Sequence, residues 1–108
     1  MIVDERMITY IHSLETAERS VIEEIEQEAL ETFVPIIRKE TQSFLKVLLA
    51  MKQPMRVLEV GTAIGFSAIL ISEYLPQGSH ITTIEKYEKR IPIARENFKR
   101  AGREDQIT

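Results

Sequence analysis

The residues best suited to chemistry lie in the segment LEVGTAIGFSA, residues 58–68. A short apolar run leads into Gly61 and Gly65, and a carboxylate, Glu59, stands two positions before the first glycine. A strand that ends in glycine and continues into a helix is typical of nucleotide-binding loops, because the ligand then meets exposed backbone amides at the carboxyl end of the strand. Gly61 allows both a sharp turn and a close approach of the ligand to the backbone.

The spacing of the glycines separates two kinds of nucleotide ligand. A dinucleotide fingerprint requires G-x-G-x-x-G, but its second and third glycine positions hold Ala63 and Phe66. Glu59 would also repel a pyrophosphate, whereas a ligand with a positive centre and no phosphate suits an acidic loop. S-adenosylmethionine, with its sulfonium and ammonium groups, is such a ligand. An NAD-dependent dehydrogenase is the alternative that Ala63 and Phe66 argue against.

A second acid, Glu85, closes an apolar run that lies beyond the glycine loop. A carboxylate at the end of a strand can accept two hydrogen bonds from a ribose diol. An acid at the end of a buried strand has few purely structural explanations. Three other residues of this region have ordinary structural alternatives: Ser67 as a helix N-cap, Glu59 as a solvent-facing strand residue, and Ile37 as plain core.

These residues need a scaffold, and the hydrophobic periodicity predicts one in the second half of the chain. Strands are expected over 56–60 and 80–85, and helices over 67–75 and 88–101. The short aliphatic first strand is expected to be buried, and a right-handed crossover would make the two strands parallel. The final residues, 105–108, look like the approach to a third strand.

The first half is expected to be helical, over 4–13, 16–32 and 39–52. Four apolar side chains of the third helix are expected in the core: Phe44, Leu45, Leu48 and Leu49. The predicted fold class is α/β, with an N-terminal helical segment over 1–53 and, over 54–108, the first βαβα of a mostly parallel, Rossmann-like sheet. Two strands are few for such a sheet, so we expect the chain to be the first part of a single, larger domain.

The composition excludes several classes of site. The chain has no cysteine, which rules out a disulfide framework, a thiol nucleophile and a thiolate metal site. No apolar run approaches the ~18–20 residues that a membrane span needs, and the acidic N-terminus does not resemble a signal peptide. We therefore expect a cytoplasmic protein with no membrane partner.

The charges are unevenly distributed along the chain. Residues 1–32 carry nine acids against two bases, and residues 86–103 carry seven bases against two acids. Solvated helix faces are the ordinary explanation. The alternative is a basic edge for a polyanion such as RNA, whose binding would be sensitive to salt.

Three segments carry a resemblance to a known family: VPIIRKETQSFLKVLL, VLEVGTAIGFSAI and ITTIEKYEKRIPIARENFKRAG. They resemble the class I S-adenosylmethionine-dependent methyltransferases, and within them the cation-dependent O-methyltransferases. That family includes catechol and caffeoyl-CoA O-methyltransferases and bacterial tRNA 5-hydroxyuridine methyltransferases, to which the chain looks most similar. The resemblance covers most of the chain, strongly from 34 to 102, and GTAIGFSA is its most distinctive part.

The resemblance implies cofactor-binding roles for ten residues: Ile37, Glu59, Gly61, Thr62, Ala63, Gly65, Phe66, Ser67, Glu85 and Lys86. Ile37 would lie over the methionine portion of S-adenosylmethionine, while Glu59 and Gly61 would shape the pocket for its amino-acid end. Ala63 would present backbone to the cofactor, and Ser67 would hydrogen-bond its carboxylate.

At the nucleoside end, the resemblance implies that Glu85 binds the ribose hydroxyls and that Lys86 lies beside the adenine. Members of the family also hold a divalent cation, Mg²⁺, on acidic and amide side chains that follow later strands. No residue of this chain looks like part of a metal cluster, so the catalytic and metal-binding residues are expected beyond Thr108.

The implied activity is methyl transfer to a hydroxyl oxygen, with the cation lowering the pKa of the acceptor hydroxyl and orienting it. The expected acceptor is the 5-hydroxyuridine of a tRNA, and a small catechol-like phenol is the alternative. The expected assembly is a homodimer. From a different class, the chain could be a non-catalytic fragment or interaction module. The 108 residues alone are expected to be inactive.

Overall fold

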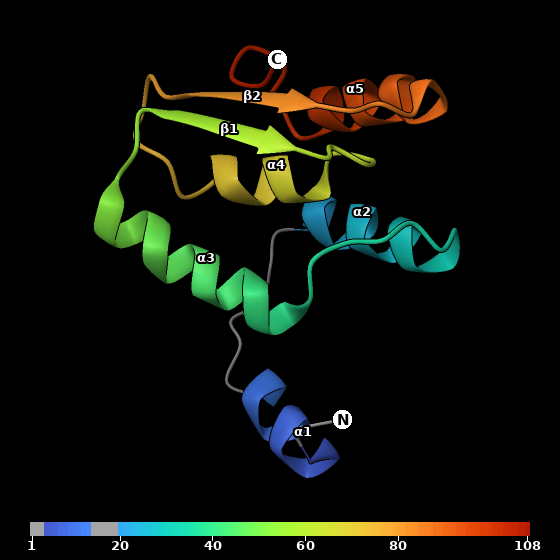
Figure 1. The fold of residues 1–108 in the computed structure, drawn as a ribbon, viewed down its shortest axis with the longest axis vertical. Coiled ribbons are helices and arrows are strands. Elements are labelled where there is room, and N and C mark those ends of the chain that lie inside the picture. Colours follow the sequence, from blue (N-terminus) through green and yellow to red (C-terminus); the bar gives the residue numbers. More distant parts are fainter. Residues whose placement is uncertain (1–3, 14–19) are drawn as a thin grey trace.

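The computed structural model describes residues 4–13 and 20–108 (Figure 1). Its elements follow in this order: α1 (Glu5–Ser13), α2 (Ser20–Glu31), α3 (Lys39–Lys52), β1 (Arg56–Val60), α4 (Phe66–Ser72), β2 (His80–Ile84), the 3₁₀ turn η1 (Glu88–Arg90) and α5 (Ile91–Arg100). The helical first half and the β-α-β-α second half are as predicted, and the start of the predicted helix over 16–32 lies outside the described residues.

The sheet is parallel, as the crossover rule predicts. β1 pairs with β2 from Arg56 opposite His80 onwards. On the other side of β2, Ile107 forms a parallel bridge with Ile81. Residues 105–108 therefore do approach as a third strand, and β2 lies between β1 and the C-terminal residues.

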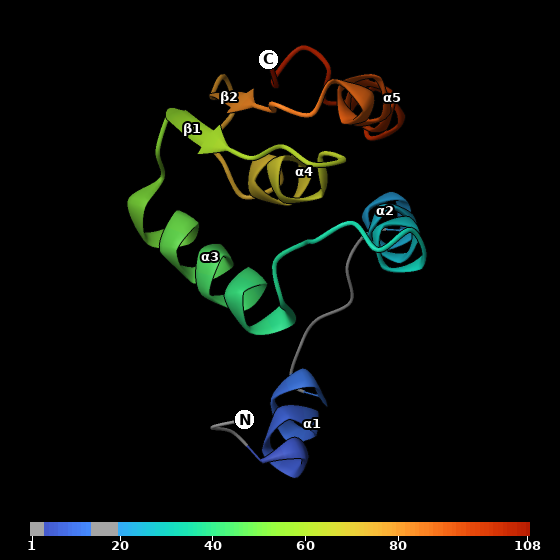
Figure 2. The same cartoon turned by 45° about the vertical axis from the view of Figure 1, so that its right-hand side comes forward.

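The helices form layers on one face of this sheet. Helix α4 lies directly against the strands, and α2 and α3 pack on the far side of α4 (Figures 1 and 2). Helix α5 lies beside β2, and α1 extends away from the other elements. Because α4 has neighbours on both sides, every residue of FSAILIS except Ser67 is buried. An all-round apolar helix is what such a position requires.

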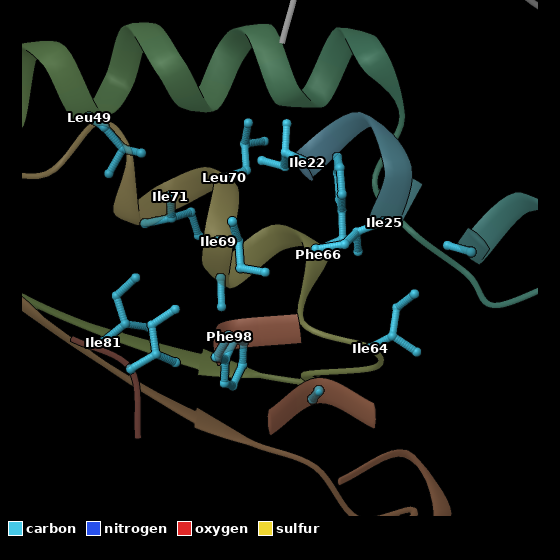
Figure 3. Close-up of a cluster of buried hydrophobic side chains, with 14 residues drawn as sticks. Ile22, Ile25, Leu49, Ile64, Phe66, Ile69, Leu70, Ile71, Ile81 and Phe98 are labelled. Atoms are coloured by element: carbon cyan, nitrogen blue, oxygen red, sulfur yellow. The ribbon is translucent and has the colours of Figure 1, made fainter. Parts of the chain in front are cut away.

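The core surrounds α4 and draws on both halves of the chain (Figure 3). Ile22 and Ile25 of α2 pack with Phe66 of α4. Ile81 of β2 and Phe98 of α5 contribute to the same core from the sheet side of α4. The core is therefore continuous between the N-terminal helices and the sheet.

The prediction that β1 is buried was wrong for one of its faces. Leu58 is 66% exposed and Val60 is 79% exposed, while the alternate residues are half-buried. The side chains of a strand point alternately to the two faces of a sheet, and only the face against α4 is covered by the described residues.

The core prediction for α3 was also partly wrong. Leu49 is buried and Leu45 is half-buried, but Phe44 and Leu48 are exposed, Phe44 to 65%. The apolar stripe of α3 is wider than the area that its neighbour α4 can cover. The periodicity identified the stripe but not the width of the surface packed against it.

Two helices differ from their predicted bounds for local reasons. Helix α4 begins at Phe66 and ends at Ser72, whose hydroxyl donates to the Ile69 carbonyl. The predicted helix over 88–101 opens with the 3₁₀ turn η1, in which the Ile91 amide donates to the Glu88 carbonyl. Pro92 has no amide to donate to Glu88 in an α-helical turn, so the tighter turn replaces it.

Among the described residues, none of the helices combines the length and the apolar character that a membrane crossing requires.

Candidate functional site

The loop between β1 and α4 lies at the carboxyl ends of both strands. The amides of Gly61 and Thr62 both donate to the carbonyl of Ile84, at 2.7 and 3.2 Å, so the start of the loop is held against the end of β2. The Gly65 amide then donates to the Thr62 carbonyl at 2.9 Å. Gly61, Ala63 and Gly65 all have positive φ angles. Ala63 is thus a non-glycine residue in the left-handed region, which is uncommon and points to a conformation fixed by its surroundings.

The two glycines of the loop serve different purposes. A Cβ atom on Gly61 would meet no other atom within 4 Å, so this position faces open space. A Cβ atom on Gly65 would lie 2.6 Å from Cε1 of Phe98. Gly61 therefore leaves room for a ligand, whereas Gly65 lets α5 pack closely against the loop.

Glu59 lies behind the loop, in a network of hydroxyl groups. One carboxylate oxygen accepts a hydrogen bond from Ser67, and the other accepts one from Thr83 at 2.7 Å. The hydroxyls of Thr62 and Thr83 lie 2.7 Å apart. Glu59 is half-buried and joins β1, β2 and α4, so it is not a solvent-facing strand residue.

Ser67 is not the N-cap of α4, because Gly65 occupies that position. The hydroxyl of Ser67 has a single proton, which it donates to Glu59. The predicted contact with a cofactor carboxylate would therefore require this hydroxyl to rotate away from Glu59.

Glu85 follows β2 directly, and backbone amides orient its carboxylate. The Ala63 amide donates to Oε1 and the Tyr87 amide donates to Oε2, both at 2.8 Å. Both hydrogen bonds lower the pKa of Glu85, and the bond from Tyr87 has the larger effect. Burial raises the pKa in opposition, while the positive charge of Arg90 lowers it further. The group is thus a carboxylate at neutral pH. Its two oxygens offer about four acceptor positions, and the amides use two, which leaves two for a ligand.

Two hollows flank the glycine loop, and Thr62 lines both. The first has a volume of about 270 Å³, with Ile37, Gly61, Ala63 and Ser67 on its walls. The second, of about 640 Å³, lies between the end of β2, α5 and the C-terminal residues.

The structure brings seven of the ten predicted residues to these hollows: Ile37, Gly61, Thr62, Ala63, Phe66 and Ser67 line the first, and Thr62 and Glu85 line the second. Three predicted residues line neither hollow. Glu59 is bonded behind the loop, Gly65 is covered by Phe98, and the side chain of Lys86 is exposed.

Two buried amide side chains hold the walls of the site, and the sequence reasoning did not identify them. The Gln42 side-chain amide donates to the Ile37 carbonyl at 3.0 Å and to Glu26 at 3.0 Å. The Asn97 side-chain amide donates to the Ile64 carbonyl at 2.8 Å. A signal was present for Asn97, because a lone amide stands next to Phe98 in the apolar stripe of a helix.

The acidic and basic segments of the sequence meet in the fold. Arg100 of α5 forms ion pairs with Glu24 at 2.9 Å and with Glu28 at 3.1 Å, both on α2. Arg103 lies 4.0 Å from Glu73. Part of the basic segment is thus engaged within the protein rather than presented to a partner.

The described residues do not supply a metal site. Over 4–13 and 20–108, no group of three or more His, Asp or Glu side chains is placed to hold an ion. What the described residues offer at this site is a carboxylate oriented by backbone amides and an open stretch of backbone at Gly61.

Comparisons with known proteins give a consistent result. The family model described as O-methyltransferase matches residues 12–108. Catechol O-methyltransferase of Niastella koreensis is 34% identical over 64 residues, which are 59% of this chain and 29% of that protein.

Two solved structures share the fold. The O-methyltransferase of Bacillus cereus, in complex with SAH, superposes with a TM-score of 0.80 at 29% identity, over 92% of this chain and 46% of that chain. The O-methyltransferase TomG of Streptomyces achromogenes, involved in tomaymycin synthesis and in complex with SAM, gives a TM-score of 0.82 at 26% identity, over 100% of this chain and 51% of that chain. The predicted fold class is confirmed, and the chain spans about half the length of these two proteins.

Proposed function

Because this chain belongs to the O-methyltransferase family, whose model matches residues 12–108, we propose that it forms the cofactor-binding part of a methyltransferase. In this proposal it binds S-adenosylmethionine, and the methyl group passes from the cofactor's sulfonium to a hydroxyl oxygen of the acceptor. Two relatives of similar fold were solved with SAM or SAH, which supports this choice of ligand.

One observation carries the proposal most directly: the carboxylate of Glu85 is fixed by two backbone amides and keeps two acceptor positions open. A ribose presents two adjacent hydroxyls, and a carboxylate binds such a pair with two charge-assisted hydrogen bonds. Gly61 lies in the loop whose Ala63 amide binds this carboxylate, and it leaves space where a longer ligand can pass along the backbone. Both features suit a nucleoside with an extended substituent.

For the acceptor, we propose a small catechol-like phenol. The Niastella koreensis relative is named as a catechol O-methyltransferase, and within the described part of the chain Arg100 and Arg103 of the basic segment lie against acids. The 5-hydroxyuridine of a tRNA is the second candidate. In its favour, four bases of the segment that form neither of these ion pairs are exposed: Lys86, Lys89, Arg95 and Lys99.

The described residues provide no donor set for the divalent cation that the resemblance implies. The role proposed for this chain is therefore to bind and orient the cofactor. The homodimer stays a prediction, which sedimentation equilibrium would test.

Calorimetric titration of the purified chain with S-adenosylhomocysteine tests cofactor binding. We expect Glu85→Gln to weaken binding by about ten- to a hundredfold, because hydrogen bonds to a charged group are worth about 1.5–3 kcal/mol. Glu88→Gln removes an exposed carboxylate three residues away and is the matched control, expected to bind like the wild type. Binding of NAD instead of S-adenosylhomocysteine, or equal binding by both variants, would contradict the proposal.

The acceptor is tested by methyl transfer from labelled S-adenosylmethionine in the native protein, with tRNA and catechol in competition. Label in catechol supports the phenol, and label in tRNA that declines with rising salt supports the alternative. The isolated 108 residues are expected to show no turnover in the same assay.

A further inference from the structure

Helix α5 holds the glycine loop through two neighbouring residues. The side-chain amide of Asn97, which is 2% exposed, donates to the Ile64 carbonyl at 2.8 Å. The ring of Phe98 covers Gly65 so closely that no Cβ would fit between them. Both contacts fall in the middle of the loop, between Gly61, which faces open space, and the start of α4. Neither Asn97 nor Phe98 lines the first hollow, so α5 contacts the loop outside it.

Asn97 is itself held by a charged group. Nη1 of Arg100 donates to Oδ1 of Asn97 at 3.2 Å, and the same nitrogen donates to Glu28 at 3.1 Å. Nη2 of Arg100 donates to Glu24 at 2.9 Å. One guanidinium thus links two carboxylates of α2 to the amide that holds the loop. Glu24 and Glu28 lie one helical turn apart, so both can face the same guanidinium.

We propose that Asn97 and Arg100 are positioning residues through which α2 holds the cofactor loop in its binding conformation. The inference rests on the proposed function, because it assigns these residues to the same cofactor site. Neither residue contacts the hollow that Gly61 and Ala63 line. They act through the backbone of Ile64, which Asn97 binds directly.

The position of the Ile64 carbonyl matters because Ala63 is the preceding residue. Asn97 fixes the peptide group between Ile64 and Gly65, one residue beyond Ala63, while the Ala63 amide donates to Glu85. Ala63 adopts a φ of 51°, which an alanine rarely takes without support from its surroundings. Without the Asn97 bond the loop would gain alternative conformations, and each would move the amide that orients the Glu85 carboxylate.

The loop itself can be observed by amide hydrogen exchange in the chain without any cofactor. Asn97→Asp keeps the size of the side chain and an acceptor for Arg100, but removes the donor to Ile64. We expect the amides of Ala63 and Gly65 to exchange about tenfold faster in this variant, since a buried carbonyl loses its partner. The amide of His80, which bonds across the sheet to Met55, is expected to keep its rate. Equal acceleration at His80 would indicate a general loss of stability and would overturn the proposal.

The role of α2 is tested through the charges. Arg100→Gln is expected to accelerate exchange at Ala63 and Gly65 by about two- to fivefold, because half-exposed ion pairs contribute modestly. Lys99→Gln removes the same charge from an exposed position of the same helix and is expected to leave the loop unchanged. The double variant with Glu24→Gln and Glu28→Gln should accelerate exchange as much as Arg100→Gln does. Combining all three substitutions should give no further acceleration. Fully additive effects would overturn the link from α2 to the loop.

The final measurement is the affinity for S-adenosylhomocysteine in the same variants. We expect Asn97→Asp to bind about tenfold more weakly than the wild type, and Lys99→Gln to bind equally well. If the wild type binds and Asn97→Asp binds as tightly, the positioning role is refuted while the proposed function stands. If the wild type itself fails to bind, the proposed function is refuted, and the exchange of Ala63 and Gly65 still decides whether Asn97 holds the loop.

Discussion

Replacing Gly65 by alanine tests the close contact between the glycine loop and α5. A Cβ atom at this position would lie 2.6 Å from Cε1 and 3.2 Å from both Cδ1 and Cζ of Phe98. Relieving that overlap requires the buried ring or the helix to shift, which costs about 1–3 kcal/mol in a packed core. The φ of +92° adds strain of about 1–2 kcal/mol for any residue with a side chain. We therefore expect Gly65→Ala to lower the free energy of unfolding by about 2–5 kcal/mol.

The control is Gly61→Ala, at a φ of +100° with no neighbouring atom within 4 Å. This variant carries the backbone strain without the overlap, so it should cost only about 1–2 kcal/mol. Urea denaturation followed by far-ultraviolet circular dichroism measures both variants in the same chain. A Phe98→Leu background should narrow the difference between the two, because the smaller side chain leaves room for the methyl group. Equal costs for Gly65→Ala and Gly61→Ala would refute the reasoning.

Two further predictions concern acid and the core. The amides of Tyr87 and Ala63 lower the pKa of Glu85 in the folded protein. The carboxylate therefore stabilises the fold above the ordinary carboxyl pKa of about 4.3. That stabilisation is lost as the pH falls through the lowered pKa of the folded protein. The urea midpoints of wild type and Glu85→Gln should accordingly converge as the pH falls below the ordinary carboxyl pKa. A constant difference between the midpoints across the acid range would exclude this role. Ile25 is fully buried, so Ile25→Ala should lower the free energy of unfolding by about 2–4 kcal/mol. Leu30→Ala, at an exposed position of the same helix, is the control and should lower it by under about 0.5 kcal/mol in the same urea titration.

The parallel strands and the glycine loop could be predicted because their signals are local. The strand over 56–60 has the predicted bounds, since Pro54 and Gly61 mark both of its ends. The glycine positions have an equally local cause: the turn requires positive φ at Gly61 and Gly65. Glu85 was predicted as a site residue from its place at the end of a strand, and it lies at the second hollow.

Features that depend on distant partners could not be predicted in the same way. Asn97 donates to a carbonyl 33 positions earlier in the chain, and no local pattern links the two residues. Glu59 was predicted from its charge, but its hydroxyl partner Thr83 lies 24 positions away. The exposure of Phe44 depends on how much of α3 its neighbour covers, which the periodicity of α3 itself does not contain.

The orientation of Glu85 has a consequence for which substitutions the site can accept. Its carboxylate is held by the amides of Ala63 and Tyr87, not by their side chains. Nineteen of the twenty standard amino acids carry that amide, and proline alone lacks it. At position 87 the side chain can therefore change without loss of the backbone bond that gives the carboxylate its direction. At position 63 the left-handed backbone narrows the choice to small or glycine-like residues. A motif of side chains can therefore represent the constraint at position 63, but it cannot represent the backbone amide of position 87 that also orients this carboxylate.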